Sequence, residues 1–563
     1  MDFLRKYYRT EPPVPVLAHL DTDLYGLIHF SVNTFTNKEW GYGNPEDARL
    51  FNPVEFDADQ IVSAAKDGGL KGIILVCKHH DGFCLWRTKT TTHNISNCPW
   101  RDGKGDMVRE FSDSCRKHGL KFGVYVSPWD RNSAVYGTPE YVKIFEEQIR
   151  EVLTQYGEIF EMWFDGANGG DGWYGGACEK RNIGFAKDYY NWDRIFGIVR
   201  ELQPNARIFN GPDLRWCGNE RGHIPPDSSA RFFPFYHVKG EEEKLSGAEI
   251  YEQYQNGRKD APYFIIPECD FPMRQGWFYH PESDGLSRSA LTLLMNYLDT
   301  VGNGGLMNLG LVPDRRGLLT DEDCRKLKGF GEKLKMLRET KVFELDLAGD
   351  GIFRIDISQD QPFQVLELVE DIANSHGEKV EQYTISLDGK ELISGTVIGL
   401  RRIRLLKEEI CGKKLTVTLK GSSFVRITGW QPGKDLLTPI DDPAEHFDDK
   451  AFEDVTDKII FSGISTLTID FGKIRKFNGF VMTPDPDDLE GLPLRYAIQI
   501  CNDGENWEWL VLDEGFENIQ ANPIPQRVRL KSTSARFLKF MSYQPVRDGA
   551  PMKIKAFAIL RED

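Results

Sequence analysis

Several features that would place a protein in a specialised class are missing from this chain of 563 residues. No apolar run approaches the ~20 residues that a membrane helix needs. Acidic side chains outnumber basic ones by 86 to 70, and the resulting formal net charge of −16 disfavours a nucleic-acid backbone or an anionic membrane surface as a partner. We therefore expect a globular protein, with neither nucleic acid nor membrane as partner, whose ligand is neutral.

Paired cysteines and an export signal are also missing. The ten cysteines are scattered and include no C-x-x-C pair, which disfavours a zinc ribbon and a disulfide framework. The first residues, "MDFLRKYYRT", lack the apolar core of a signal peptide. We expect a periplasmic or extracellular protein whose signal peptide is absent from this numbering, with a cytoplasmic location as the alternative. The sequence carries no signal for the oligomeric state.

The first 340 residues alternate between short apolar runs and amphipathic segments. The seven runs lie at 25–32, 71–79, 121–129, 159–165, 207–210, 261–268 and 306–312. The amphipathic segments are typical of helices; "PEYVKIFEEQIREVLTQYG", for example, starts with Pro139, stops before Gly157 and carries a periodic apolar face. Such alternation predicts parallel β-α units and a (β/α)₈-like TIM barrel over residues 1–340. The pattern leaves the eighth strand and residues 211–260 unassigned.

The remainder of the chain is patterned as strands. Alternating apolar and polar residues predict a small antiparallel β-sandwich over residues 341–432. A passage rich in Pro, Gly and Asp, "QPGKDLLTPIDDPAEHFDD", then indicates a linker. Further strand patterns over residues 441–563 predict a second sandwich, so the expected architecture is an α/β barrel followed by two β-sandwich domains.

Polar side chains gather where the predicted barrel strands end. They are His29, His79, His80, Tyr125, Asp165, Glu268 and Asp270. The carboxyl ends of barrel strands form the active face of such folds. A carboxylate such as Asp165, at the mouth of a buried strand, is costly to desolvate unless a polar or cationic group meets it. This pattern predicts a functional site.

Aromatic residues suggest what this site binds. Trp40 lies in a loop, next to Glu39, and several other tryptophans lie near the polar set. Aromatic rings beside carboxylates and imidazoles suit a sugar, because its C–H face packs on a ring while its hydroxyls need donors and acceptors. We expect Trp40 to belong to the site and Trp163, inside a strand, to belong to the core.

A metal site and a serine or cysteine nucleophile are the competing interpretations. The sequence contains neither H-E-x-x-H nor H-x-H, and the adjacent His79 and His80 would point to opposite faces of a strand. G-x-S-x-G is also absent. We therefore expect no metal ion, no cofactor, and carboxylate chemistry on a carbohydrate.

Four motifs carry a resemblance to a known family. "GLIHFSVNTFTNKEWGYG", "KGIILVCKHHDGFCLW", "KFGVYVSPWDRN" and "MWFDGANG" resemble, in this order, motifs of the retaining α-L-fucosidases of glycoside hydrolase family 29. The resemblance implies an exo-acting, double-displacement mechanism on a fucosylated oligosaccharide or glycoconjugate, with Asp165 as nucleophile. It also implies a set of sugar-binding residues: His29, Glu39, Trp40, His79, His80 and Tyr125. A non-catalytic fucose-binding protein on the same scaffold is the alternative.

The acid/base residue is less defined. "NGPDLRWCGNERG" resembles the subgroup that acts on α1,3- and α1,4-linked fucose in branched glycans, which implies Glu220. Glu268, at the end of a predicted strand in "FIIPECD", is the alternative acid/base residue. Trp277 in "RQGWFYH" is expected to form an aromatic wall of the site.

The last domain carries a second resemblance. "STLTIDFGKIRKFNGFVMTPD", "LRYAIQICNDGENWEW" and "ARFLKFMSY" resemble discoidin-like modules of the coagulation factor 5/8 type C kind. The resemblance implies a possible carbohydrate-binding role. The alternative is a sandwich that only braces the barrel.

Overall fold

The computed structural model describes residues 6–166, 170, 172–184, 189–234, 247–357, 361–421, 423–439, 452–485, 488–516, 519–520, 523–547 and 549–561. The chain divides into two compact units, of which the first comprises Met1–Phe271 and Ala290–Ile440 and the second comprises Pro272–Ser289 and Asp441–Asp563. The second unit thus includes a short segment from the middle of the chain. None of the described helices is long and apolar enough to cross a membrane.

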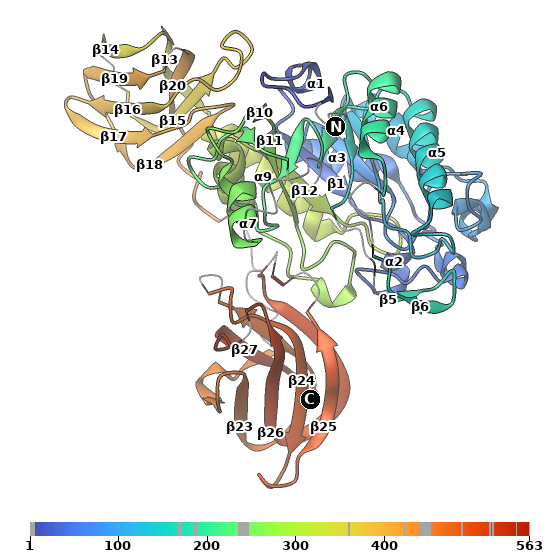
Figure 1. Ribbon diagram of the computed structural model, residues 1–563. Coiled ribbons are helices and arrows are strands. Elements are labelled where there is room, and N and C mark those ends of the chain that lie inside the picture. Colours follow the sequence, from blue (N-terminus) through green and yellow to red (C-terminus); the bar gives the residue numbers. More distant parts are fainter. Residues whose placement is uncertain are drawn as a thin grey trace. The chain divides into compact units, whose positions relative to one another are not determined.

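The first unit is built around a closed barrel of parallel strands (Figure 1). Around the barrel the strands follow the order β1, β12, β11, β8, β7, β4, β3, β2. Their bounds are β1 Leu24–Ile28, β2 Gly72–Lys78, β3 Lys121–Val126, β4 Glu161–Trp163, β7 Arg207–Phe209, β8 Leu214–Trp216, β11 Ile266–Pro272 and β12 Leu306–Leu311. This confirms the (β/α)₈-like fold class expected from the sequence.

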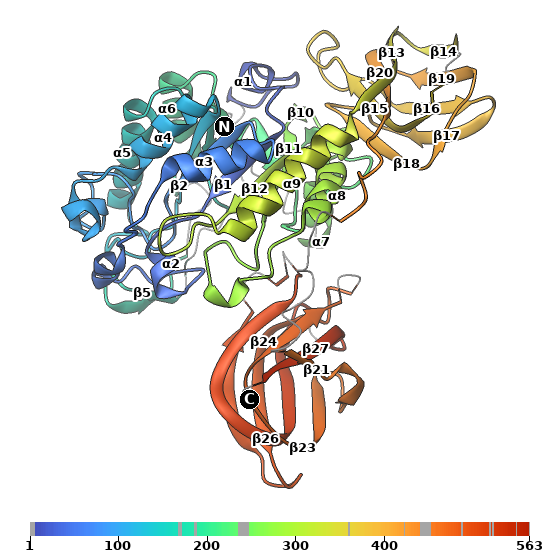
Figure 2. The same ribbon diagram turned by 180° about the vertical axis from the view of Figure 1, so that it is seen from behind.

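Helices connect and cover the barrel strands (Figure 2). The main ones are α3 Ala58–Asp67, α4 Met107–His118, α5 Pro139–Gln155, α6 Trp192–Leu202, α7 Gly247–Asn256, α8 Ala290–Thr300 and α9 Asp321–Leu337, and α1 Val14–Leu17 and α2 Val32–Thr36 are short. Local sequence sets their ends. In α4 the carboxylate of Asp106 accepts the backbone N–H of Arg109, and Gly119 ends the helix at φ +74°, a left-handed conformation that glycine adopts without strain.

Two barrel strands differ from the sequence expectation. The strand that could not be assigned is β8, which has three residues and lies inside the unassigned stretch. The strand expected to end at Glu268 continues as β11 to Pro272, after the short β10 (Tyr263–Phe264), which pairs with β9 (Arg231–Phe232) outside the barrel. Glu268 therefore lies within a strand rather than at its end.

A polar layer fills the barrel interior at the level of Glu268. One oxygen of Glu268 accepts a hydrogen bond of 2.6 Å from the Tyr25 hydroxyl. The other accepts from the Trp163 indole at 2.9 Å and from the Asn308 amide at 2.8 Å. Glu161 forms an ion pair of 2.8 Å with Arg207 in the same layer. Burial, and then the nearby Glu268 carboxylate, raise the pKa of Glu161 well above its usual value.

The first unit ends in a β-sandwich. One sheet has the order β13, β20, β15, β18, and the other has the order β14, β19, β16, β17. The bounds are β13 Thr340–Ala348, β14 Gly351–Asp356, β15 Phe363–Glu370, β16 Gln382–Leu387, β17 Lys390–Gly395, β18 Arg402–Ile410, β19 Lys414–Lys420 and β20 Phe424–Gln431. Alternation explains the core: in β19, Leu415, Val417 and Leu419 are buried and the lysines at both ends are exposed.

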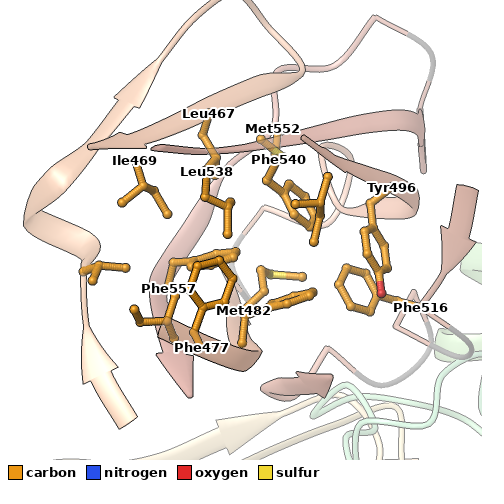
Figure 3. Packing of buried hydrophobic residues seen from close by; sticks show 14 of the residues in the cluster. Leu467, Ile469, Phe477, Met482, Tyr496, Phe516, Leu538, Phe540, Met552 and Phe557 are labelled. Carbon is orange, nitrogen blue, oxygen red and sulfur yellow. The ribbon is translucent and has the colours of Figure 1, made fainter. Parts of the chain in front are cut away.

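The second unit contains one antiparallel sheet, in the order β21, β27, β23, β26, β24, β25, with β22 paired to β23. Its strands are β21 Phe452–Asp454, β22 Ile459–Phe461, β23 Thr466–Pro484, β24 Pro493–Cys501, β25 Glu508–Gly515, β26 Gln526–Pro545 and β27 Ile554–Arg561. Figure 3 shows how Phe540 from β26, Phe557 from β27 and Tyr496 from β24 point into one core. Tyr496 stacks on Phe516, with 4.4 Å between ring centroids. We call the domain of residues 452–561 the module.

A small antiparallel pair of strands also belongs to the first unit. The pair β5 (Gly172–Tyr174) and β6 (Glu179–Arg181) follows β4 in the chain. The Tyr174 hydroxyl accepts a hydrogen bond of 3.2 Å from the Trp129 indole. This contact connects the β5–β6 pair to the loop after β3.

Candidate active site

Asp165 lies two residues beyond β4, at the carboxyl end of the barrel. One of its oxygens accepts a hydrogen bond of 2.7 Å from the Tyr125 hydroxyl, which comes from β3. The same oxygen lies 3.6 Å from Nε2 of His80. The Asp165 side chain keeps 22% of its surface exposed. It is therefore held in place on one side and open to a ligand.

Three imidazoles accompany this carboxylate. His29 follows β1, and His79 and His80 follow β2. Ring centroids are 5.4 Å apart between His29 and His79 and 4.0 Å apart between His79 and His80. Burial lowers the pKa of all three well below its ordinary value, and the neighbouring imidazoles lower it further. The three rings are therefore neutral near pH 7, and each can both donate and accept a hydrogen bond.

The position of His79 and His80 corrects one argument made from the sequence. The two side chains were expected to point to opposite faces of a strand, but β2 ends at Lys78, so strand alternation no longer applies to them. One donor atom from each of His79, His80 and Asp165 lies within 4.8 Å of the others. The expectation that the two histidines point to opposite faces was thus wrong.

Aromatic rings form the next part of the cluster. Trp40 is half exposed, and its indole lies 5.8 Å from the His80 ring and 5.7 Å from the Trp129 ring. Trp163, by contrast, is buried and stacks between Tyr125 and Phe209, with centroids 5.0 and 4.1 Å away. Both rings thus lie where the sequence suggested, Trp40 at the cluster and Trp163 in the core.

Two supporting residues were not among the candidates chosen from the sequence. Ser127 Oγ lies 2.7 Å from Nδ1 of His80, which fixes the orientation of this ring. Arg131 is buried and donates to the backbone carbonyls of Trp40 and Gly41, at 3.4 and 3.3 Å. Both belong to the quoted motif "KFGVYVSPWDRN", so the motif contained a signal for them. Glu39 is buried next to Trp40, and its backbone carbonyl accepts from the Asn33 amide at 3.1 Å.

Glu220 lies on a turn after β8 that is fixed by its neighbour. Asn219 is buried, its amide donates to the carbonyl of His223 at 2.9 Å, and its side-chain oxygen accepts the backbone N–H of Arg221 at 3.1 Å. Gly222 closes the turn at φ +80°, where an added Cβ would lie 2.6 Å from the Asn296 amide nitrogen. Glu220 itself is half-buried.

Asp270 connects this turn to β11. It is buried, lies two residues beyond Glu268, and its Oδ1 has no hydrogen-bond partner among the described residues. Burial, and then the Glu220 carboxylate, raise the pKa of Asp270 well above its usual value. The carboxyl groups of Glu220 and Asp270 thus lie close enough to interact at the carboxyl ends of β8 and β11.

The structure therefore brings together most of the residues chosen from the sequence, at one end of the barrel. His29, His79, His80, Tyr125, Trp40 and Asp165 form one connected group. Glu268 lies deeper in the barrel, and Trp277 belongs to the second unit, so its role as a wall of the site stays a prediction. A closed parallel barrel with carboxylates, neutral imidazoles and aromatic rings at this end is typical of a glycoside hydrolase.

Comparisons with known proteins agree with this class. The family model described as Alpha-L-fucosidase matches residues 19–339, and the model described as F5/8 type C domain matches residues 447–551. The chain is 33% identical to Alpha-L-fucosidase 1 of Arabidopsis thaliana over 418 residues, which cover 73% of this chain and 78% of that protein. It is 35% identical to Putative alpha-L-fucosidase 1 of Oryza sativa subsp. japonica over 352 residues, which cover 61% and 62%.

Solved structures extend the similarity over the full chain. A glycoside hydrolase 29 family member from an unknown rumen bacterium has a TM-score of 0.71 at 31% identity, covering 99% of this chain and 100% of that one. A putative alpha-L-fucosidase from Bacteroides ovatus has a TM-score of 0.67 at 31% identity, covering 98% and 96%. The chain belongs to the alpha-L-fucosidase family and is a glycosidase with a C-terminal F5/8 type C domain, which confirms both resemblances drawn from the sequence.

Proposed function

We propose that this protein is an exo-acting, retaining α-L-fucosidase that uses Asp165 as nucleophile and Glu220 as acid/base. The observation that carries the proposal is the environment of Asp165. A nucleophile must stay ionised, and the hydrogen bond from Tyr125 favours the charged form of this carboxylate. His80, whose Nε2 lies 3.6 Å from this carboxylate, is neutral near pH 7, so its ring does not compete as a cation with the developing positive charge on the sugar.

The positions of the two carboxylates support this assignment. Asp165 follows β4 and Glu220 follows β8, and only β7 separates these strands in the barrel. Adjacent strands lie ~4.8 Å apart, so the two strand ends are about 10 Å apart. Side chains that reach inward from both ends can approach the ~5–5.5 Å between carboxyl groups that retaining glycosidases use.

Double displacement then assigns a task to each group. Asp165 attacks the anomeric carbon while protonated Glu220 donates its proton to the departing oxygen, and a covalent fucosyl-enzyme forms. Glu220, now ionised, takes a proton from water, which attacks the same carbon and releases fucose with retained configuration. Asp270, whose pKa is raised by burial and then by the Glu220 carboxylate, is the neighbouring acidic group of Glu220 at this end of the barrel.

The sugar-binding role is proposed for the cluster around Asp165. Neutral histidines can accept from one fucose hydroxyl and donate to another. The exposed Trp40 offers a ring face to the apolar side of the sugar. The motif that contains Glu220 supports α1,3- and α1,4-linked fucose in branched glycans as the substrate.

The test compares the wild type with Asp165→Asn on an aryl α-L-fucoside and on α1,2-, α1,3- and α1,4-fucosylated oligosaccharides. We expect release of fucose by the wild type, with the α-anomer appearing first in the NMR spectrum, and preference for the α1,3 and α1,4 linkages. Asp165→Asn should bind fucose but lose turnover by orders of magnitude. Binding without turnover by the wild type would instead identify a non-catalytic fucose-binding protein.

A further inference from the structure

The segment Pro272–Ser289 belongs to the second unit, although it precedes most of that unit in the chain. It continues directly from β11, two residues after Asp270, and leads into α8. Loops that follow barrel strands at their carboxyl ends build the active face of this fold. The packing of this segment, which we call the β11 loop, is therefore relevant to catalysis.

The two arms of the β11 loop are joined by hydrogen bonds and an ion pair. At its base the backbone N–H of Arg288 donates to the carbonyl of Met273 at 2.8 Å. The side chain of Arg274 is 1% exposed and forms an ion pair of 2.7 Å with Asp284. The other oxygen of Asp284 accepts from the Tyr279 hydroxyl at 3.0 Å. These contacts give the loop one defined conformation instead of an open chain of many conformations.

The module holds this loop at two points on strand β26. The Gln275 side chain donates to the buried Gln526 at 3.2 Å and accepts the backbone N–H of Arg527 at 2.9 Å. The Arg527 guanidinium donates to the carbonyl of Asp284 at 2.9 Å. Arg527 also lies over the ring of Phe452 in β21, 4.6 Å from its centroid. The loop thus meets the first residues of β26 at both of its arms.

We propose that the module is a positioning domain for the β11 loop, and that Gln526 and Arg527 act on fucoside hydrolysis through this loop. The proposal rests on the proposed function, because it assumes that the face at the end of β11 is the active one. It also decides between the two roles that the sequence left open for the module, in favour of bracing. Capture of glycans by the module is then not needed to explain its presence.

Changes at the contact between the module and the loop test the proposal without altering the barrel. In the full chain, Gln526→Ala and Arg527→Ala each remove a contact to the loop, and Gln275→Ala removes both contacts of its amide. The matched control is Arg529→Ala, on the same strand, whose guanidinium contacts Asn478 inside the module at 3.4 Å. All four proteins are measured by hydrogen exchange over residues 273–285, by steady-state kinetics on an aryl α-L-fucoside, and by thermal melting.

We expect faster exchange in the β11 loop of Gln526→Ala and Arg527→Ala, and kcat/KM lower by about tenfold, the value of one lost hydrogen bond. Arg529→Ala should match the wild type in both. If Gln275 and Gln526 act as one clamp, the double variant should lose little more activity than either single variant. Rescue by Arg527→Lys should be partial, because a lysine can still reach a carbonyl oxygen but lacks the planar fork.

The outcomes separate this proposal from the proposed function. Unchanged exchange in the loop, or faster exchange with kcat/KM within twofold of Arg529→Ala, overturns the positioning role. A loss of kcat/KM that appears only on large glycans overturns the positioning role in favour of glycan capture by the module. A wild type without activity on any fucoside overturns the proposed function and the catalytic half of the inference together, and the exchange result alone then decides whether the module holds the loop.

Discussion

Replacement of Glu268 or Glu220 by alanine should damage this protein in two different ways. Glu268 is fully buried and accepts hydrogen bonds from Tyr25, Trp163 and Asn308. Truncation leaves three buried donors without an acceptor, at a cost of about 1–3 kcal/mol for each donor. Because neighbouring losses are not additive, we expect the free energy of unfolding to fall by about 3–5 kcal/mol.

Thermal melting measures this loss of stability. A loss of this size would lower the melting temperature by about 6–20 °C in a domain of 150–250 residues, at about 2–4 °C per kcal/mol, and by several degrees in the larger first unit. Glu268→Gln is the matched control, because it keeps the shape and one acceptor oxygen. Glu220 is half-buried on a turn that Asn219 holds, so Glu220→Ala should melt within a few degrees of the wild type.

The kinetic assay completes the distinction. Removal of a general acid matters in proportion to how strongly the leaving group needs a proton. Glu220→Ala should therefore retain the first step on aryl fucosides with acidic phenols and lose it on natural glycosidic bonds. Azide needs no base, so it should intercept the fucosyl-enzyme on Asp165 and give α-fucosyl azide.

The refuting result is specific. The acid/base role belongs to Glu268 if Glu268→Ala remains stable, its rate depends on the leaving group and azide rescues it, while Glu220→Ala shows no leaving-group dependence and no azide rescue. The hydrogen bonds counted above would then not describe its function. The motif-based support for α1,3 and α1,4 linkages would fall with the assignment of Glu220.

Three further predictions test other parts of the site. Tyr125→Phe removes the 2.7 Å hydrogen bond to Asp165. We expect kcat/KM to fall by about 10–100-fold and the acidic limb of its pH profile to move to higher pH. A change in kcat/KM below twofold contradicts this prediction. Burial raises the pKa of Asp81 to about 7, against about 3.9 in an unfolded chain, so its contribution to stability is complete below pH 4 and is lost as pH rises to 7. Urea unfolding at pH 4.5 and 7.5 should show that Asp81→Asn lacks this loss, and an equal pH dependence in both proteins speaks against it. A chelator should leave fucoside hydrolysis unchanged, whereas loss of activity that zinc restores would assign a metal to His79, His80 and Asp165.

Periodicity explains which parts of the fold could be predicted. Helix α5 repeats its buried face with Tyr141, Phe145, Ile149 and Val152, and it begins at a proline, so both its period and its start are visible in the sequence. Strand β8 has only three residues, which is too short to show any period. Its place became clear only from its pairing with β7 and β11.

The site could be predicted as a set of residues but not as a geometry. Strand ends supply the side chains, and the order of strands in the barrel brings them together, so His29, Tyr125 and Asp165 could be chosen from the sequence. The direction of a side chain just past a strand end depends on how the chain turns there. His79 and His80 illustrate this. Neighbouring residues on a strand point to opposite faces, yet these two rings, which follow β2, lie only 4.0 Å apart.

Depth along a strand is the property that sequence patterns conceal most completely. Glu268 and Asp270 are both acidic, both in β11 and two residues apart, so they point to the same face of the strand. Yet Glu268 meets three donors in the barrel interior, whereas Asp270 lies one step nearer the end and interacts with Glu220. A step of two residues along a strand is about 6.6 Å, more than the ~5.5 Å that separates the carboxyl groups of a retaining glycosidase. A strand end misjudged by four residues therefore moves a carboxylate from the mouth of the barrel into its interior, which is why Glu268 was placed at a strand end in the sequence and is buried among three hydrogen-bond donors in the fold.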